Sequence, residues 1–366
     1  MMRRTILIGF LSLTHCAEVS RIFTGNPGPK VRAQGIVDTH IHTSPSEQER
    51  LHNIMDEQGI RWGLNLSGRW PGGGLEKQIQ SAQASGRLLV ACNLPWFAAS
   101  RTEKFPSLAA QLLQESHQMG ARALKVSKGL GLGVIKPDQS LLAVDDPWLD
   151  PIWAMAAKLN MPVVIHTGDP KAFWDPVDKH NERFEELSAH PNWSNHGVKG
   201  LPSFEEILNQ LSRLVAKHPK TKFVSVHFGN NAEDPDWVSD QLSRYPNLYI
   251  DVSARLPEFG RHPAEKIRAL FIKHADRILF GSDLGVSPGD FLMLGSFGEE
   301  PSKREDAKPF FDTHWRYFET DDRKIPSPTP IQGRWTLDGI NLPKEILVKL
   351  YRENAFKVFG PWPESK

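Results

Sequence analysis

The sequence predicts an α/β protein whose core is a (β/α)8 TIM barrel, with long loops after the fifth and eighth strands. Three observations lead to this fold class. Short apolar or β-branched segments recur along the chain, helical segments alternate with them, and eight strand–helix units fit into 366 residues. A doubly wound open sheet usually contains fewer strands, so the number of units favours a closed barrel.

The strand candidates are short and rich in Val, Ile, Leu and Ala, and helical segments separate them. Several of these helical segments begin near Pro, Ser or Asp and end near Gly or Asn. In chain order the expected strands are Gly35–His42, Arg61–Ser67, Leu88–Leu94, Ala121–Ser127, Pro162–His166, Lys222–His227, Asn247–Ser253 and Arg277–Ser282. The expected helices are Leu75–Ser85, Ser107–Met119, Pro147–Asn160, Ser203–Lys217, Asp236–Arg244, Pro263–His274 and a last one, Pro343–Phe359, that ends at Gly360.

Two connections are too long to be plain connectors. They are Gly168–Gly200, after the fifth strand, and Leu284–Asn341, after the eighth. In a barrel of this kind the loops after the strands form the catalytic face. We therefore expect both connections to form lids or walls over an active site, with surface decoration or oligomer contact as the alternative.

The first residues predict export. Met1–Arg4 is basic, Ile6–Leu13 is apolar, and the small residues Cys16 and Ala17 follow. The apolar run is about half of the ~20 residues that a membrane-spanning helix needs. We expect residues 1–20 to be a secretory signal peptide, residues 33–366 to form the barrel domain, and the protein to be periplasmic or extracellular. A lipid anchor at Cys16, disfavoured by the bulky His15, and a buried first helix are the alternatives.

Charge and cysteine content exclude several classes of partner and site. The chain has 44 Lys and Arg against 43 Asp and Glu, so it lacks the basic surplus that nucleic acid or an anionic membrane requires. Only two cysteines occur, and Cys92 stands alone if Cys16 leaves with the signal peptide. Any metal site must then be built from His and carboxylate side chains.

The end of the first expected strand, Asp38-Thr39-His40-Ile41-His42, is the sharpest local signal. Strand side chains alternate, so His40 and His42 point to the same side, expected to be the barrel lumen, with Asp38 one step deeper. Two neighbouring buried imidazoles need a common partner, and a metal ion is the best candidate. On its own this pair is a weak signal.

Other strands also end in side chains that can bind a metal or move a proton. His166 ends the fifth strand, His227 the sixth and Asp283 the eighth, while the seventh carries Asp251 and ends near Arg255. A single histidine after an apolar strand is more often structural. Several at the same end of one barrel predict a metal site.

The motifs DTHIH, VVIHTG, FVSVHFGN, LFGSD and YRENAFKVFG together resemble the amidohydrolase superfamily. Within it they are most similar to the amidohydrolase-2 branch, which includes aminocarboxymuconate-semialdehyde decarboxylase-like enzymes. The resemblance implies one divalent metal ion, with Zn2+ favoured and Mn2+ or Fe2+ left open. It implies that His40, His42, His166 and Asp283 bind this ion and that His227 lies beside the metal-bound water.

The function expected from this resemblance is hydrolysis of an amide, ester or lactone by metal-activated water. Asp283 and His227 would move the proton, and Arg255 with Lys125 would hold an anionic group of a small-molecule substrate. Lys125 could instead be carboxylated and bridge a second metal, or reach solvent. Non-oxidative decarboxylation is the alternative reaction, and a binding module without turnover is a third reading. A homo-oligomer is left open.

Overall fold

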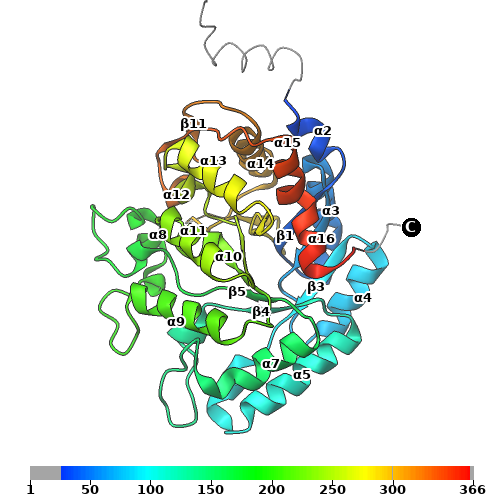
Figure 1. The fold of residues 1–366 in the computed structure, drawn as a ribbon, viewed down its shortest axis with the longest axis vertical. Helices are drawn as coiled ribbons and strands as arrows, with labels where there is room; N and C mark the ends of the chain where they lie inside the picture. Colours follow the sequence, from blue (N-terminus) through cyan, green and yellow to red (C-terminus); the bar gives the residue numbers. More distant parts are fainter. Residues whose placement is uncertain (1–25, 299, 363–366) are drawn as a thin grey trace, which may run out of the picture.

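Eight parallel strands form the centre of the structure, and the computed structural model confirms the predicted fold class (Figure 1). The model describes residues 26–298 and 300–362, so the predicted signal peptide at 1–20 lies outside the described residues. From β1 to β8, each strand pairs in parallel with the next along the chain. The strands are β1 (Ile36–Thr43), β2 (Ile60–Asn65), β3 (Leu88–Cys92), β4 (Ala123–Val126), β5 (Val163–Ile165), β6 (Phe223–Ser225), β7 (Leu248–Asp251) and β8 (Ile278–Leu279).

The eighth strand is interrupted, and its two parts close the barrel against β1. After β8, the chain turns at Asp283, whose φ is 64°, and continues as β9 (Leu284–Ser287), which pairs in parallel with β1. Between the two parts, the Thr39 N–H donates to the Phe280 carbonyl at 2.9 Å and the Asp283 N–H donates to the His40 carbonyl at 3.0 Å. The interruption therefore leaves the Asp283 side chain next to the end of β1.

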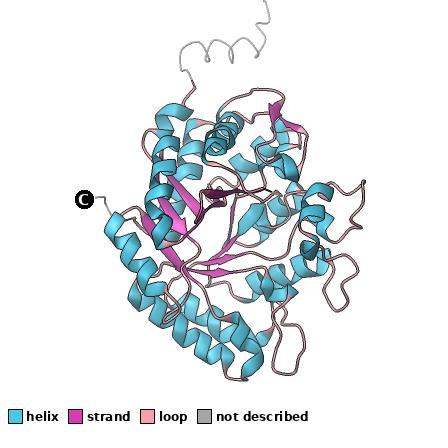
Figure 2. Ribbon diagram, turned by 180° about the vertical axis from the view of Figure 1, so that it is seen from behind, coloured by secondary structure: helices cyan, strands magenta, loops and turns pink. Residues whose placement is uncertain are grey.

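A helix follows each strand and packs outside the barrel (Figures 1 and 2). The expected helices are present, and α3 adds one between the first two strands. Common capping residues are found at the helix ends: the Ser203 hydroxyl accepts the Glu206 N–H at 3.1 Å, and Gly86 ends its helix with a φ of 65°. The helices after the first seven strands are α3 (Gln48–Gln58), α4 (Leu75–Ser85), α5 (Phe105–Met119), α7 (Asp150–Lys158), α9 (Phe204–Lys217), α11 (Pro235–Arg244) and α13 (Ala264–Lys273).

The last expected helix is not regular. It consists of α15 (Lys344–Val348), a π-helical turn at Lys349–Glu353, and α16 (Asn354–Phe359). The Leu350 carbonyl accepts the Phe280 N–H at 3.0 Å, and Asn354 Nδ2 donates to the Ile278 carbonyl at 2.7 Å. These bonds to the strand segment explain the π-helical turn, because the helix bonds to the backbone of β8 as well as to itself.

Apolar side chains alternate between two packed layers along the strands. Val163 and Ile165 pack in the layer between strands and helices, whereas Val164 belongs to a separate cluster that fills the barrel interior. The C-terminal segment joins this inner cluster, where Trp362 Nε1 donates to the Gly63 carbonyl at 3.1 Å. The inner cluster closes one end of the barrel, so the carboxyl ends of the strands lie at the other end.

The two long connections have their own secondary structure. Buried Arg183 pairs with Glu186 at 2.6 Å and contacts Glu258, and Ser296 donates to Glu186, so ionic contacts tie both connections to the segment after β7. The first connection carries α8 (Phe184–Ala189). The second carries β10 (Phe291–Leu294), α14 (Arg304–Glu319), β11 (Ile325–Pro326) and β12 (Thr336–Leu337); elsewhere lie α2 (Gly28–Arg32), α6 (Gly129–Leu132), α10 (Val226–Gly229) and α12 (Leu256–Gly260).

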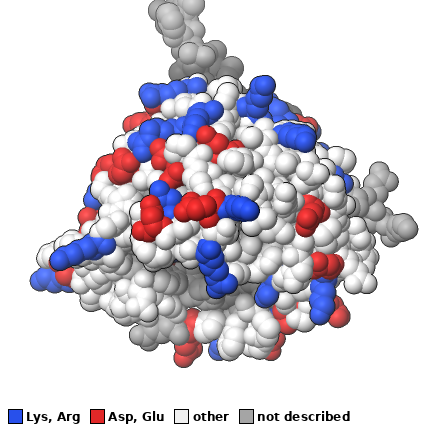
Figure 3. Space-filling view, turned by 90° about the horizontal axis from the view of Figure 1, so that it is seen from below, with Lys and Arg blue, Asp and Glu red and all other residues white. Residues whose placement is uncertain are grey.

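The surface carries both signs of charge. On the face in Figure 3, Lys and Arg are interspersed with Asp and Glu. None of the helices in the described residues is long and apolar enough to cross a membrane.

Candidate metal and catalytic site

The ends of six strands bring the predicted site residues to one end of the barrel. Ala123, Val164 and Tyr249 belong to the inner apolar cluster. Two residues further along the same strands come Lys125, His166 and Asp251, which period-two alternation places on the lumen side. The neighbouring strands contribute His40 and His42 from β1, His227 after β6, and Asp283 between β8 and β9.

His40, His42 and Asp283 meet directly. His40 Nε2 lies 3.2 Å from Asp283 Oδ1, and His42 Nε2 lies 3.5 Å from the same oxygen. The three ligand atoms fall within 4.8 Å of one another, as atoms that share one metal ion must. His42 Nδ1 contacts the Ser67 hydroxyl at 2.8 Å, which fixes the ring with Nε2 facing Asp283. This arrangement could hold a metal ion.

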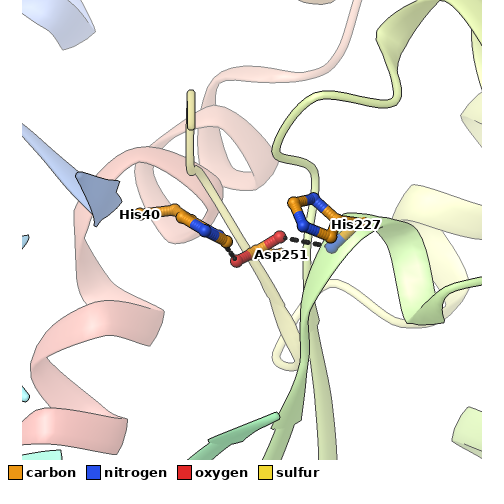
Figure 4. A group of neighbouring side chains, drawn as sticks. All are labelled: His40, His227 and Asp251. Carbon is orange, nitrogen blue, oxygen red and sulfur yellow. Dashed lines mark hydrogen bonds and ion pairs between the residues drawn. The ribbon is translucent and has the colours of Figure 1, made fainter. Parts of the chain in front are cut away.

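A second group forms on the other side of His40, around Asp251 (Figure 4). His40 Nδ1 donates to Asp251 Oδ2 at 2.9 Å, which leaves the His40 Nε2 lone pair directed at Asp283. Asp251 Oδ1 accepts the His227 N–H at 2.9 Å and the Ser253 hydroxyl at 2.6 Å. Since the carboxylate already has these donors, we interpret Asp251 as the group that orients His40 rather than as a ligand.

His227 and His166 continue the row of imidazoles. The His227 ring lies 5.0 Å from the His40 ring and 4.3 Å from the His166 ring, measured between centroids. His227 Nδ1 lies 3.0 Å from the Ser253 carbonyl, which only accepts, so this nitrogen carries the proton and Nε2 is free to accept one. The buried His166 Nε2 has no hydrogen-bond partner among the described residues.

Burial keeps these imidazoles neutral. Loss of solvation lowers the pKa of His40, His166 and His227 well below the usual value, and lowers the pKa of His42 to about 3. The same cause raises the pKa of Asp283 to about 7. Neutral imidazole is the form that binds a metal, and the positive charge of an ion would favour the ionised form of Asp283.

Two cationic side chains lie near this group. Burial lowers the pKa of Lys125 to about 8, while the charges of Asp251 and Asp283 oppose this shift. The Lys125 Nζ has no hydrogen-bond partner in the described part of the chain. Arg255 is also buried and donates through Nη1 to the Ala254 carbonyl at 2.8 Å. Lys128, by contrast, pairs with Asp169 at 2.7 Å.

Four non-glycine residues at these strand ends have strained backbone. His227, Phe228, Ala254 and Asp283 have φ between 53° and 64°, a region that non-glycine residues rarely adopt. Such conformations persist only where surrounding contacts enforce them, and they cluster at functional sites. The contacts of His227 with Asp251 and Ser253 provide this enforcement.

Asp38 lies deep in the barrel, where the period-two pattern placed it, but it does not join the ligand group. Its Oδ1 accepts the His40 and Ser282 N–H groups, each at 3.0 Å, and its Oδ2 accepts the Ser282 hydroxyl at 2.5 Å. Burial raises its pKa to about 7. Through its hydrogen bonds with His40 and Ser282, Asp38 links β1 to the segment after β8.

The sequence placed Asp251 among the strand-end side chains that can bind a metal or move a proton but did not predict its orienting role, and it gave no role to Ser253 or Gly281. A Cβ atom at Gly281 would lie 2.9 Å from the His40 Cβ and 3.5 Å from the Asp251 Cβ, so this position must be glycine for His40 to fit. The position of Asp251 at the end of a strand was a usable signal. The contacts of Ser253 and Gly281 depend on how strands seven and eight pack against the first, which periodicity does not describe.

One family model matches most of the chain. The family model described as "Amidohydrolase" (Amidohydro_2) matches residues 93–360, a range that excludes His40 and His42. No curated protein matches the chain.

Solved structures of similar architecture share little sequence with the chain. A dihydroxybenzoic acid decarboxylase from Polaromonas, with bound manganese and the inhibitor 2-nitroresorcinol, is 15% identical, with 89% of this chain and 96% of that chain covered and a TM-score of 0.51. A 2,6-dihydroxybenzoate decarboxylase from Rhizobium is 18% identical, with coverages of 89% and 98% and a TM-score of 0.48. Because the family model spans most of the chain, the chain belongs to the amidohydrolase-2 family of enzymes.

Proposed function

We propose that the protein is a metal-dependent hydrolase that acts on an amide, ester or lactone bond. The observation that carries this proposal is the meeting of two imidazole Nε2 atoms, from His40 and His42, with Asp283 Oδ1 within 3.5 Å at the mouth of the barrel. Three neutral imidazoles and one carboxylate, with His166 included, form a donor set suited to a catalytic divalent ion.

The residues fit such an ion. The buried His166 Nε2 has no protein partner in the described residues, and coordination would satisfy this otherwise costly polar atom. Zn2+ is our first choice for this donor set, with Mn2+ and Fe2+ as alternatives. When bound, the ion would lower the pKa of a coordinated water from 15.7 towards ~7.

We assign the proton transfer to His227 and Asp283. His227 Nδ1 donates to the Ser253 carbonyl, so the free Nε2 can accept a proton. Asp283 Oδ1 lies 3.2 Å from His40 Nε2, so this carboxylate would lie beside a water on an ion held there and could accept its proton. Together they could take a proton from the attacking water and return it to the leaving group.

We assign the binding of an anionic substrate group to Lys125 and Arg255. The Lys125 ammonium is buried and has no hydrogen-bond partner among the described residues, and the guanidinium of Arg255 is also buried. A substrate carboxylate would offset the cost of burying these charges. A small anionic molecule is therefore the substrate class that we propose.

Non-oxidative decarboxylation is the second candidate. The same two cations would hold an aromatic carboxylate beside His227, and His227 could then pass a proton to the ring carbon from which carbon dioxide leaves. The products distinguish the two reactions, because hydrolysis of an amide, ester or lactone yields a carboxylic acid, whereas decarboxylation releases carbon dioxide.

The test is a panel of lactones, esters, amides and aromatic acids, assayed on metal-loaded protein for acid release and for carbon dioxide. We expect acid release from one class, His227→Asn to abolish turnover while retaining metal, and His40→Ala to lose both. The control His117→Ala alters a histidine in the last turn of α5, on the outside of the barrel, and should change neither. Carbon dioxide release alone would replace the first proposal by the second, and full activity of His227→Asn would contradict both.

A further inference from the structure

A cleft of about 700 Å³ opens beside the metal-binding group. Its walls come from the segment after β1, the segment after β2 and the turn between β9 and β10. His42 lines this cleft and also faces Asp283, and 30% of its side chain is exposed. A molecule in the cleft would therefore contact a residue of the candidate metal group.

Arg69 lines the cleft and has a strained backbone. Its φ is 64°, in the left-handed region that favours glycine. Two hydrogen bonds hold it there: the Arg69 N–H donates to Asn93 Oδ1 at 2.6 Å, and the Asn93 N–H donates to the Arg69 carbonyl at 2.7 Å. Glycine would adopt this conformation without strain, so the presence of arginine needs an explanation other than local folding.

The Arg69 side chain is exposed and has no ionic partner among the described residues. Its Cδ would lie 3.2 Å from a Cβ atom at Gly74, and its guanidinium makes no hydrogen bond or ion pair with any residue that the structure describes. Lys77 also lines the cleft. The nearby Glu76 carboxylate already accepts the Gly72 N–H at 2.7 Å, which lowers its pKa. The cleft thus presents a guanidinium fork whose geometry suits a carboxylate.

We propose that this cleft binds the part of the substrate that lies away from the reacting bond, and that Arg69 pairs with a carboxylate on that part. The proposal rests on the proposed function for the identity of the bound molecule as substrate. Binding of a carboxylate in the cleft does not require turnover, so it can be measured separately.

The test is isothermal titration calorimetry of zinc-loaded protein with glutarate and with its neutral diamide, glutaramide. We expect glutarate to bind more tightly, and Arg69→Gln to weaken glutarate about tenfold and remove the preference, because a charge-assisted contact is lost. The matched control is Arg122→Gln, which changes an exposed arginine just before β4 that lines no part of the cleft. It should bind glutarate as the wild type does.

A second variant separates binding from folding. Arg69→Gly removes the guanidinium and relieves the strained backbone, so we expect glutarate binding to weaken as in Arg69→Gln while the Tm stays within about 2 °C or rises. Unchanged glutarate affinity in Arg69→Gln, no saturable glutarate binding to the wild type, or a clear loss of Tm in Arg69→Gly would overturn the proposal. Absence of turnover with intact Arg69-dependent binding would instead count against the hydrolase assignment.

Discussion

His40 is the residue on which the candidate site depends, because its two ring nitrogens face different partners. Nδ1 donates to Asp251 and Nε2 faces Asp283. The spacing of His40 and His42 was visible in the sequence, since alternation alone puts both rings on one side of a strand. The orienting role of Asp251 was not visible, because its contacts join the seventh strand to the first and the sixth.

Asp251→Asn should lower metal affinity about 10- to 100-fold, the usual effect of losing an orienting carboxylate. The amide keeps the volume but loses the charge that holds the Nδ1–H tautomer of His40. Competition with a chelator of known affinity measures the effect. Asp240→Asn, which changes an exposed partner of Arg244 on α11, is the control. Equal metal affinity in wild type and Asp251→Asn would show that Asp251 has no orienting role.

Gly281→Ala should displace His40. The added Cβ would lie 2.9 Å from the His40 Cβ, and overpacking of this kind typically costs about 1–3 kcal/mol of stability. We expect loss of metal together with this destabilisation, measured by metal analysis and urea denaturation. Gly133→Ala, where the nearest atom to a new Cβ is 4.0 Å away, should retain both properties. A fully metal-loaded Gly281→Ala would contradict the packing argument.

At the scale of secondary structure, the positions of the eight strands and their following helices could be predicted, because each carries its own periodicity and end signals. The interruption between β8 and β9 could not. It depends on hydrogen bonds from the backbone at Thr39 and Asp283 across the barrel seam. The π-helical turn before α16 was missed for the same reason, since Phe280 and Asn354 join the last helix to a strand distant in sequence.

A buried histidine on helix α14 leads us to predict that stability depends on pH. His314 on this helix is 1% exposed, and burial lowers its pKa to about 4. Between pH 4 and the usual pKa of 6.5, the His314 imidazole is protonated in the unfolded chain but not in the folded protein. The free energy of unfolding is therefore highest above about pH 6.5 and decreases as the pH falls towards 4.

His314→Leu should therefore flatten this part of the stability curve. The difference between pH 7 and pH 4.5 should be smaller in the variant by about 2–3 kcal/mol, an order-of-magnitude figure from the shift in pKa. Urea denaturation at the two pH values measures it. Parallel pH profiles for variant and wild type would show that His314 does not titrate in this way.

At the scale of the whole molecule, the alternation of strands and helices was enough to predict a barrel. The balanced charge was enough to disfavour a polyanionic partner. Export remains a prediction from residues 1–20. The cleft at Arg69 could not be predicted, because it forms where three segments meet. One of them, the turn between β9 and β10, belongs to a long connection whose structure sequence periodicity does not predict.

The most direct measurement of the central claim is the metal content of the purified protein and of one triple variant. We predict about one divalent ion per wild-type chain by mass spectrometry of the elements, and none when His40, His42 and Asp283 are all replaced by alanine. Circular dichroism must show that the triple variant remains folded. A folded triple variant that still carries one ion per chain would contradict the account.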